Sequence, residues 1–194
     1  MFNFENAEVS KGNYKETIKP GISIVKVTAI TNGVSTQKQT PYLEFTVEDS
    51  HGAELKQQYY LSTVVNPGKQ KSAWDISKNA ILALVAASNS LDETTAKTKM
   101  PNAKTAEELA QKLAILLTGK EFRLKVIGEE KVSQKGTKYV ASSFSNGVFC
   151  ESKQVAESDS KLFFSAEKNI KKLAIEPATT DTTFSSPAAD SVTF

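Results

Sequence analysis

Lysines and tyrosines are interleaved along stretches of this 194-residue chain whose residue pattern is typical of β-strands. This mixture could bind single-stranded nucleic acid, because cationic side chains contact phosphates and flat rings stack on bases. The residues that we predict to face outward on strands or in adjoining loops are Lys38, Tyr42, Lys56, Tyr59, Tyr60, Lys69, Lys71, Arg123, Lys125, Lys131, Lys135, Lys138 and Tyr139. Because side chains alternate along a regular strand, one of Tyr59 and Tyr60 must face the core, and the sequence leaves open which one.

Residues for catalysis or metal binding are few. His51 is the only histidine and lies in a predicted turn, so a histidine-based zinc site or a Ser-His-Asp triad is not expected. Cys150 is the only cysteine, has no histidine nearby in the sequence and is interpreted as a buried strand residue. The chain contains no glycine-rich phosphate-binding motif. We therefore expect no enzymatic activity, no metal and no cofactor, with a metal-dependent nuclease built on scattered carboxylates as the catalytic alternative.

The distribution of charge favours a polyanionic partner. All 24 lysine and arginine side chains lie in residues 1–175, and three of the 22 acidic side chains lie in residues 176–194. The body therefore carries a formal charge of +5 and the tail a charge of −3. This asymmetry suits nucleic acid as a ligand. A mildly basic protein with a polar end is the alternative interpretation.

The sequence also restricts the cellular compartment. No run of apolar residues reaches the roughly 18–20 that a transmembrane helix needs. Residues 1–5 lack the basic and apolar regions of a signal peptide. A lone cysteine fits a reducing environment. We expect a cytoplasmic protein with no membrane association.

The elements that must position the candidate residues follow in the order three strands, a helical insertion and two strands. Strands are predicted at 21–31, 41–48, 54–61, 120–127 and 137–144, from β-branched or alternating residues. The insertion, at about 72–118, contains two helices, which begin at the capping signals Ser72–Asp75 and Thr105–Glu108. A lysine-rich linker is predicted between them, at 97–104.

Smaller features complete the organisation of the chain. A short piece at 148–150 is predicted to extend the sheet, and residues 163–173 predict one short amphipathic helix. That helix could cover the barrel or join two subunits, so the oligomeric state stays open. Trp74, at the start of the first helix, is either a core residue beneath the barrel or a stacking residue in a loop. Residues 176–194 are rich in Thr, Ser, Ala and Pro and are expected to be disordered.

This order of elements is that of an OB-fold, a five-stranded Greek-key barrel with helices between strands three and four. Other small β-barrels can produce the same order. The sequence therefore predicts a mainly β, α+β domain over residues 1–175 and a flexible, weakly acidic tail over residues 176–194. Strands two and three are the usual ligand face of an OB barrel, so we expect the aromatic residues of these strands to contact the ligand.

Three features carry a resemblance to a known family. The first is Lys19-Pro20-Gly21 with the later Thr40–Phe45, the second is Leu117–Val126 followed by Gly136–Tyr139, and the third is Phe194 behind Asp190. On these features the chain resembles the single-stranded DNA-binding proteins of tailed bacteriophages. The resemblance implies an OB-fold that coats single-stranded DNA without sequence specificity during replication, recombination and repair, in the cytoplasm of a host cell. It also implies that Asp190 and Phe194 recruit replication or recombination enzymes, with an inert tail as the alternative.

Two questions about the ligand stay open. No sequence feature reads a 2′-hydroxyl group, so DNA and RNA are not distinguished. A protein-interaction or virion-associated β-barrel, whose aromatic residues form a partner surface, is the alternative to nucleic-acid binding.

Overall fold

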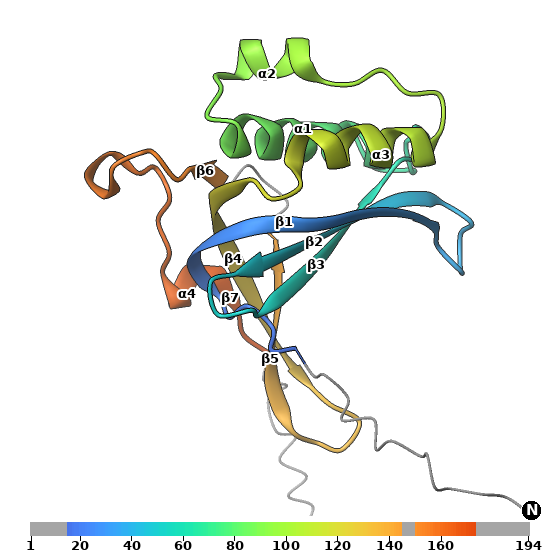
Figure 1. Ribbon diagram of the computed structural model, residues 1–194. Coiled ribbons are helices and arrows are strands. Elements are labelled where there is room, and N and C mark those ends of the chain that lie inside the picture. Colours follow the sequence, from blue (N-terminus) through green and yellow to red (C-terminus); the bar gives the residue numbers. More distant parts are fainter. Residues whose placement is uncertain (1–14, 145–149, 174–194) are drawn as a thin grey trace, which may run out of the picture.

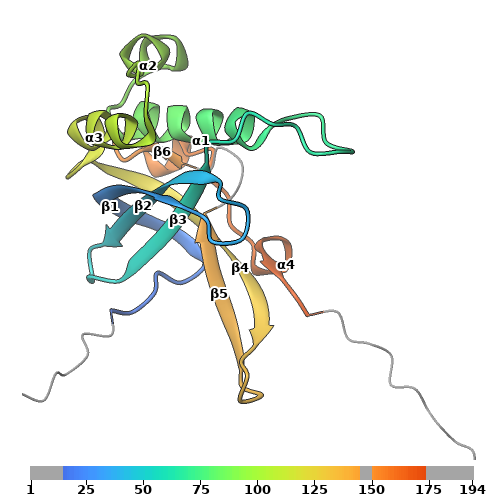
Figure 2. The same cartoon turned by 90° about the vertical axis from the view of Figure 1, so that its right-hand side faces the viewer.

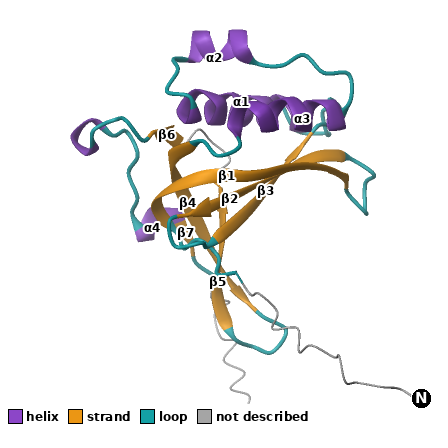
Figure 3. Cartoon of the chain, viewed as in Figure 1, coloured by secondary structure: helices purple, strands orange, loops and turns teal. Residues whose placement is uncertain are grey.

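The computed structural model describes residues 15–144 and 150–173, and over these residues the protein is mainly β with helices, an α+β arrangement (Figure 1). Seven strands in this part of the chain form a single sheet. The helices of the insertion form a layer at one end of that sheet (Figure 3). The predicted helical insertion between the third and fourth strands is therefore confirmed.

The main path of the sheet has the order β3-β2-β1-β4-β5, and its neighbouring strands are antiparallel. These strands are β1 (Gly21–Val34), β2 (Pro41–Asp49), β3 (Glu54–Tyr60), β4 (Glu121–Val132) and β5 (Lys138–Phe144). Two short strands also pair with β4: β6 (Cys150–Ser152) is antiparallel to it and β7 (Ile170–Lys171) is parallel. No ladder joins β3 to β5 in the described residues, yet these two end strands contact each other (Figure 2).

All five long strands occur where the sequence predicts them. β1 and β4 continue beyond their predicted ends, to Val34 and Val132. The predicted extension at 148–150 corresponds to β6, although residues 148 and 149 lie outside the described part of the chain.

Alternation along the strands decides which side chains form the core. Leu43, Phe45 and Val47 of β2 are fully buried, as their spacing predicts. Ile81 and Leu113, from the two long helices, belong to the same buried cluster. The core therefore fills the inside of the curled sheet and continues beneath the helical layer.

The two long helices begin at their predicted caps. They are α1 (Ala73–Ser88) and α3 (Ala106–Leu117). The Ser72 hydroxyl accepts a hydrogen bond from the Asp75 N–H at 3.1 Å, and the Asp75 carboxylate accepts one from the Ser72 N–H at 3.2 Å. This reciprocal pair is a complete capping box. None of the described helices is long and apolar enough to cross a membrane.

A third helix of the insertion, α2 (Glu93–Lys99), was not expected from the sequence. Asp92 caps it by accepting a hydrogen bond from the Thr95 N–H at 2.9 Å. The prediction of a linker at 97–104 is therefore wrong for residues 97–99. Pro101 follows the end of the helix, where it cannot continue a helical hydrogen-bond pattern. A seven-residue helix is too short to show a clear period in the sequence.

Residues 150–173, which we call the strap, run along β4 and return the chain to the sheet. They contain β6, a single turn of 3-10 helix at Glu157–Asp159, the one-turn helix α4 (Ala166–Asn169) and β7. The predicted amphipathic helix over 163–173 is therefore wrong for most of its length. Ile170 and Lys171 pair with Gly128 and Glu129 of β4 instead, so strand pairing replaces the last turn of the expected helix.

Candidate nucleic-acid interface

Two tyrosines form an aromatic pair on the outer face of the sheet. Tyr42 of β2 lies directly opposite Tyr60 of β3. Their ring centroids are 5.9 Å apart and the ring planes meet at 66°, the edge-to-face geometry that aromatic quadrupoles favour. The Tyr60 residue is 38% exposed, so its ring can be reached by a ligand.

Gly33 explains how the Tyr42 ring can lie close to the sheet. Gly33 of β1 is the register partner of Tyr42. A Cβ atom at position 33 would come within 2.6 Å of the Tyr42 Cζ atom. Only glycine leaves room for the ring there, and the ring covers the backbone of β1.

The tyrosine pair forms one wall of a groove of about 580 Å³. The β1–β2 loop forms a second wall, which includes Lys38, and the loop between β3 and α1 adds Ser62, Val64 and Asn66. Lys38 is exposed, and no ion pair involves it among the residues that the structure describes. The groove therefore combines accessible rings, neutral polar side chains and a cation that is free to meet an anion.

A row of hydrogen-bonded side chains continues from the tyrosine pair along the same face. The Tyr60 hydroxyl donates to Gln58 Oε1 at 3.1 Å, and Gln58 Nε2 donates to Glu44 Oε2 at 3.1 Å. The Lys56 ammonium lies 3.6 Å from Glu44 Oε1. Lys56 is thus exposed, as predicted, but its charge already has a partner.

Farther along this face the charges are paired. Glu48 lies 3.1 Å from the Lys26 ammonium and 3.4 Å from that of Lys15, which also contacts Glu54 at 2.5 Å. The hydrogen bond from Lys26 lowers the pKa of Glu48 below its ordinary value. The unbalanced positive charge on this face therefore lies at the end where Lys38 and the tyrosines are.

Tyr59 is the tyrosine that faces the core. It is 8% exposed, and its ring packs edge-on against Phe45 with centroids 5.2 Å apart. Burial raises the pKa of its hydroxyl group. Inclusion of Tyr59 in the outward-facing set is therefore wrong, and Tyr60 is the outward residue of the pair.

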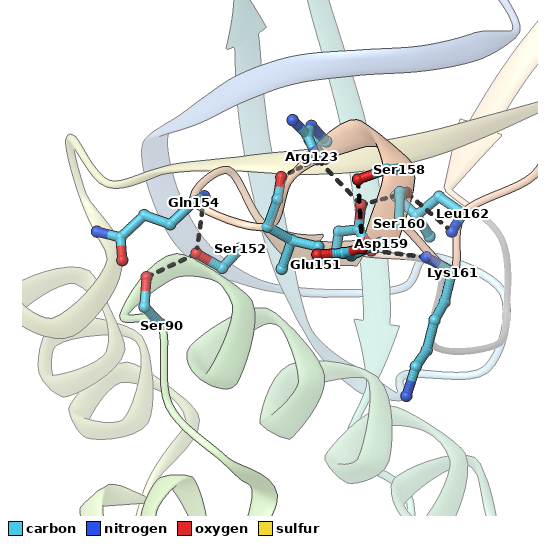
Figure 4. Close-up of polar contacts among 11 residues, drawn as sticks. Ser90, Arg123, Glu151, Ser152, Gln154, Ser158, Asp159, Ser160, Lys161 and Leu162 are labelled. Atoms are coloured by element: carbon cyan, nitrogen blue, oxygen red, sulfur yellow. Dashed lines mark hydrogen bonds and ion pairs between the residues drawn. The ribbon is translucent and has the colours of Figure 1, made fainter.

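The predicted outward exposure of Arg123 is also wrong, because the strap covers it (Figure 4). Arg123 Nη1 donates to the Val155 carbonyl oxygen at 2.6 Å and to Glu151 Oε1 at 3.3 Å. Glu151 also accepts hydrogen bonds from the Ser160 hydroxyl and, at 3.1 Å, from the Lys161 N–H. Burial acts to raise the pKa of Glu151, but these hydrogen bonds outweigh it and hold the pKa below its ordinary value.

Lys125 lies under the same strap. It is 7% exposed, and its ammonium donates to the Phe163 carbonyl oxygen at 2.9 Å. The alternation that put Arg123 and Lys125 on the outer side of β4 is correct, but that side faces the strap rather than solvent. Neither residue lines the groove.

The remaining predicted cations are exposed but lie outside the groove. Lys69 and Lys71 belong to the β3–α1 loop that supplies part of its wall. Lys135, Lys138 and Tyr139 belong to the β4–β5 hairpin, which projects away from the helical layer (Figures 1 and 2). Because side chains alternate, Lys138 and Tyr139 point to opposite faces of this hairpin.

The hairpin also carries Lys131, the register partner of Tyr139. Its ammonium group lies 3.4 Å from Glu129. Lys131 and Tyr139 therefore share one face of the hairpin, and the charge of Lys131 is already partnered.

The structure also defines the surroundings of Trp74, His51 and Cys150. Trp74 is partly buried against the hydrophobic core, as the core interpretation predicts. His51 is exposed in the β2–β3 turn. Burial, with a smaller effect of the Glu151 charge, raises the pKa of the Cys150 thiol to about 12. Within the described residues, no three His, Cys, Asp or Glu side chains gather in a way that could hold a metal ion.

A second groove, of about 780 Å³, lies between α1 and the strap. It is lined mainly by small or apolar residues such as Leu82, Ala83, Ala86 and Leu91. No Lys, Arg, Tyr, Phe or Trp is among the described residues that line it. Size alone does not make it a nucleic-acid site, because it offers neither phosphate contacts nor stacking surfaces.

The sequence pattern did not identify three residues of the site, which are Gly33, Glu44 and Gln58. The period-2 pattern could have identified Gln58, since residues 58 and 60 share a face of the same strand. Gly33 and Glu44 required the register between strands, which the sequence does not show. The tail residues Asp190 and Phe194 lie outside the described part of the chain.

No protein-family model matches the chain, and no curated protein matches it.

Proposed function

We propose that this protein binds single-stranded DNA in the groove beside Tyr42, Tyr60 and Lys38, on a sheet that forms an OB-type barrel. The observation that carries the proposal is the accessible tyrosine pair beside a lysine that has no ion-pair partner in the described residues. Rings and cations side by side are the combination that a flexible single strand requires.

Three features support the OB-type barrel. The strand order is β3-β2-β1-β4-β5, the long helices lie between β3 and β4, and the end strands β3 and β5 contact each other. The ligand face of an OB barrel is formed by its second and third strands and the neighbouring loops. Tyr42, Tyr60 and the β1–β2 loop of this chain have those positions.

The proposed mode of binding uses base stacking and phosphate contacts together. The Tyr42 ring packs over Gly33 and is partly exposed, and Tyr60 is 38% exposed, so we expect the exposed parts of both rings to stack on bases. Each stacked base contributes about 1–3 kcal/mol, and all four bases have a π-face, so such binding tolerates any sequence. Lys38 would contact the backbone, and Lys69 and Lys71 could extend that contact along the neighbouring loop.

The wider role that we propose is coating of single-stranded DNA during phage replication, recombination and repair, without catalysis. The resemblance to phage single-stranded DNA-binding proteins and the basic body with its acidic tail support this role. Lys135, Lys138 and Tyr139 of the projecting hairpin would serve as a second contact region. Asp190 and Phe194 would recruit partner enzymes.

The test is a fluorescence-anisotropy titration of the full chain with labelled oligo-dT and with a duplex of equal length, at two salt concentrations. We expect tighter binding to the single strand, with a log–log salt slope of about −0.7 per phosphate contacted. Tyr60→Ala should weaken binding about 5- to 150-fold, the effect of one lost stacked base. Lys38→Gln should reduce the magnitude of the slope by about 0.7.

Lys99→Gln is the matched control for Lys38→Gln. Lys99 is an exposed cation at the end of α2, on the helical layer, and no described residue forms an ion pair with it. Its loss changes the net charge equally and should leave the slope unchanged. Equal or tighter binding to the duplex would contradict the proposal and favour a protein-interaction module. Loss of labelled DNA with magnesium or manganese would indicate a nuclease.

A further inference from the structure

One side chain beside the tyrosine pair has no role in the binding mode described so far. Gln58 lies between Glu44 and Tyr60 and is hydrogen-bonded to both. We infer that Gln58 is a positioning residue, which fixes the orientation of the Tyr60 ring for stacking. The functional part of this inference rests on the proposed binding of single-stranded DNA.

The chemistry of its two neighbours fixes the orientation of the Gln58 amide. An ionised Glu44 carboxylate only accepts hydrogen bonds, so the amide NH₂ group must point toward it. The amide oxygen then points the other way, where it accepts from the Tyr60 hydroxyl at 3.1 Å. Reversal of the amide would set two acceptors against each other at Glu44. The Lys56 ammonium lies 3.6 Å from Glu44 Oε1, on the other oxygen of the carboxylate.

The Tyr60 ring is therefore held at two places. Its ring packs against Tyr42 with centroids 5.9 Å apart. Its hydroxyl group is held by Gln58. A half-exposed aromatic side chain without these contacts would sample several rotamers, and ligand binding would have to order it. A ring that is ordered in the free protein avoids this cost.

The row of side chains formed by Gln58, Glu44 and Lys56 orients the Tyr60 ring and is not expected to contact phosphates. Glu44 is negative and Lys56 neutralises it, so the row adds no net positive charge to the groove. Loss of Gln58 should therefore change the affinity for single-stranded DNA without changing the number of phosphate contacts. The salt slope separates these two effects.

A double-mutant cycle in the full chain tests the inference. The variants are Gln58→Met, Tyr60→Phe and the double variant, each titrated with labelled oligo-dT by anisotropy at two salt concentrations. We expect each single variant to bind about three- to ten-fold more weakly, the effect of one neutral hydrogen bond. The double variant should be no weaker than the single variants, because both remove the same bond, and all slopes should be equal.

Gln154→Met is the matched control. Gln154 is an exposed glutamine of the strap and is one of the residues that line the other groove. Its substitution should change neither affinity nor slope. If Gln58→Met weakens binding equally in the wild-type and Tyr60→Phe backgrounds, Gln58 contacts DNA itself and the inference is wrong. It is also wrong if Gln58→Met has no effect while Tyr60→Ala weakens binding, a result that leaves the proposed function intact.

A second measurement needs no DNA. Scalar couplings about χ1 of Tyr60, measured by NMR, should report one rotamer in the wild-type protein and rotamer averaging in Gln58→Met. A thermal unfolding curve confirms that the variant is folded. A single rotamer in both proteins would overturn the inference, whether or not the wild-type chain binds single-stranded DNA. Failure of the wild-type chain to bind would separately refute the proposed function.

Discussion

Replacement of Arg123 by methionine separates a structural role from a DNA-binding one. Arg123 is the only arginine of the chain, and the alternation along its strand predicts that it faces outward and contacts phosphate. The structure instead uses it to hold the strap, through Glu151 and the Val155 carbonyl group. Arg123→Met keeps most of the side-chain volume and removes only the charge and its hydrogen bonds.

The magnitude follows from how deeply the pair is buried. The Arg123 and Glu151 side chains are 14% and 12% exposed. Breaking a fully buried pair costs about 3–5 kcal/mol, because one charge is left without a partner. Residual solvent access reduces this cost, so we expect a loss of about 2–3 kcal/mol in the free energy of unfolding. For a chain of this size the melting temperature should fall by about 4–12 °C.

The assay combines thermal unfolding with hydrogen exchange. The strap should lose protection first, including the Lys161 N–H that is bonded to Glu151, because locally weakened segments open below the global transition. Amides of the buried strand β2 should change less. The salt slope of binding to single-stranded DNA should equal that of the wild-type protein.

The reasoning would be refuted by the opposite pattern. A melting temperature within about 1 °C of the wild type, together with a salt slope reduced by about 0.7, would show that Arg123 contacts phosphate. Lys99→Met is the control, because it removes one exposed charge and should change stability by no more than about 0.5 kcal/mol.

Three further predictions concern single positions. Gly33→Ala should displace the Tyr42 ring, whose Cζ atom would lie 2.6 Å from the new Cβ, and weaken single-stranded DNA binding about ten-fold in an anisotropy titration; unchanged affinity would exclude Tyr42 as a contact. Cys150, with its pKa raised to about 12, should react with iodoacetamide far more slowly at about pH 8 in the native protein than in urea, because the thiolate is the nucleophile; equal rates would contradict its burial. Asp75 has a pKa of about 2, lowered from 3.8 by hydrogen bonds from Lys78 and Ser72, so its stabilising effect is present above the unfolded value and is lost as pH falls toward the folded one. Urea unfolding of Asp75→Asn should therefore show a weaker pH dependence over that range, and an unchanged dependence would argue against the lowered pKa of Asp75 as its source.

Much of the fold could be predicted because its signals are local. The alternation of Leu43, Phe45 and Val47 specifies a half-buried strand within a few residues. The caps at Ser72 and Thr105 fix where two helices begin. The prediction of a helix over 163–173 was wrong because it also relied on a local signal. Its apolar spacing is a local signal, and pairing with a strand distant in the sequence overrode it.

The candidate site was only partly predictable. The sequence itself determined that Lys38, Tyr42 and Tyr60 belong to strands or loops that form one region of a small β-sheet. It identified Tyr60 and Tyr59 as alternatives, since adjacent residues of a strand face opposite sides.

The tertiary structure decided which side is the core and which residues meet across strands. Register placed Tyr42 over Gly33 and Glu44 against Gln58. The strap covered Arg123 and Lys125 with a segment that follows them by about 30 to 40 residues. Sequence periodicity reports which side of a strand a residue faces, but what covers that side depends on contacts between distant segments. For this chain, those contacts separate the cations that are exposed to solvent, such as Lys38, from Arg123 and Lys125, which hold the strap.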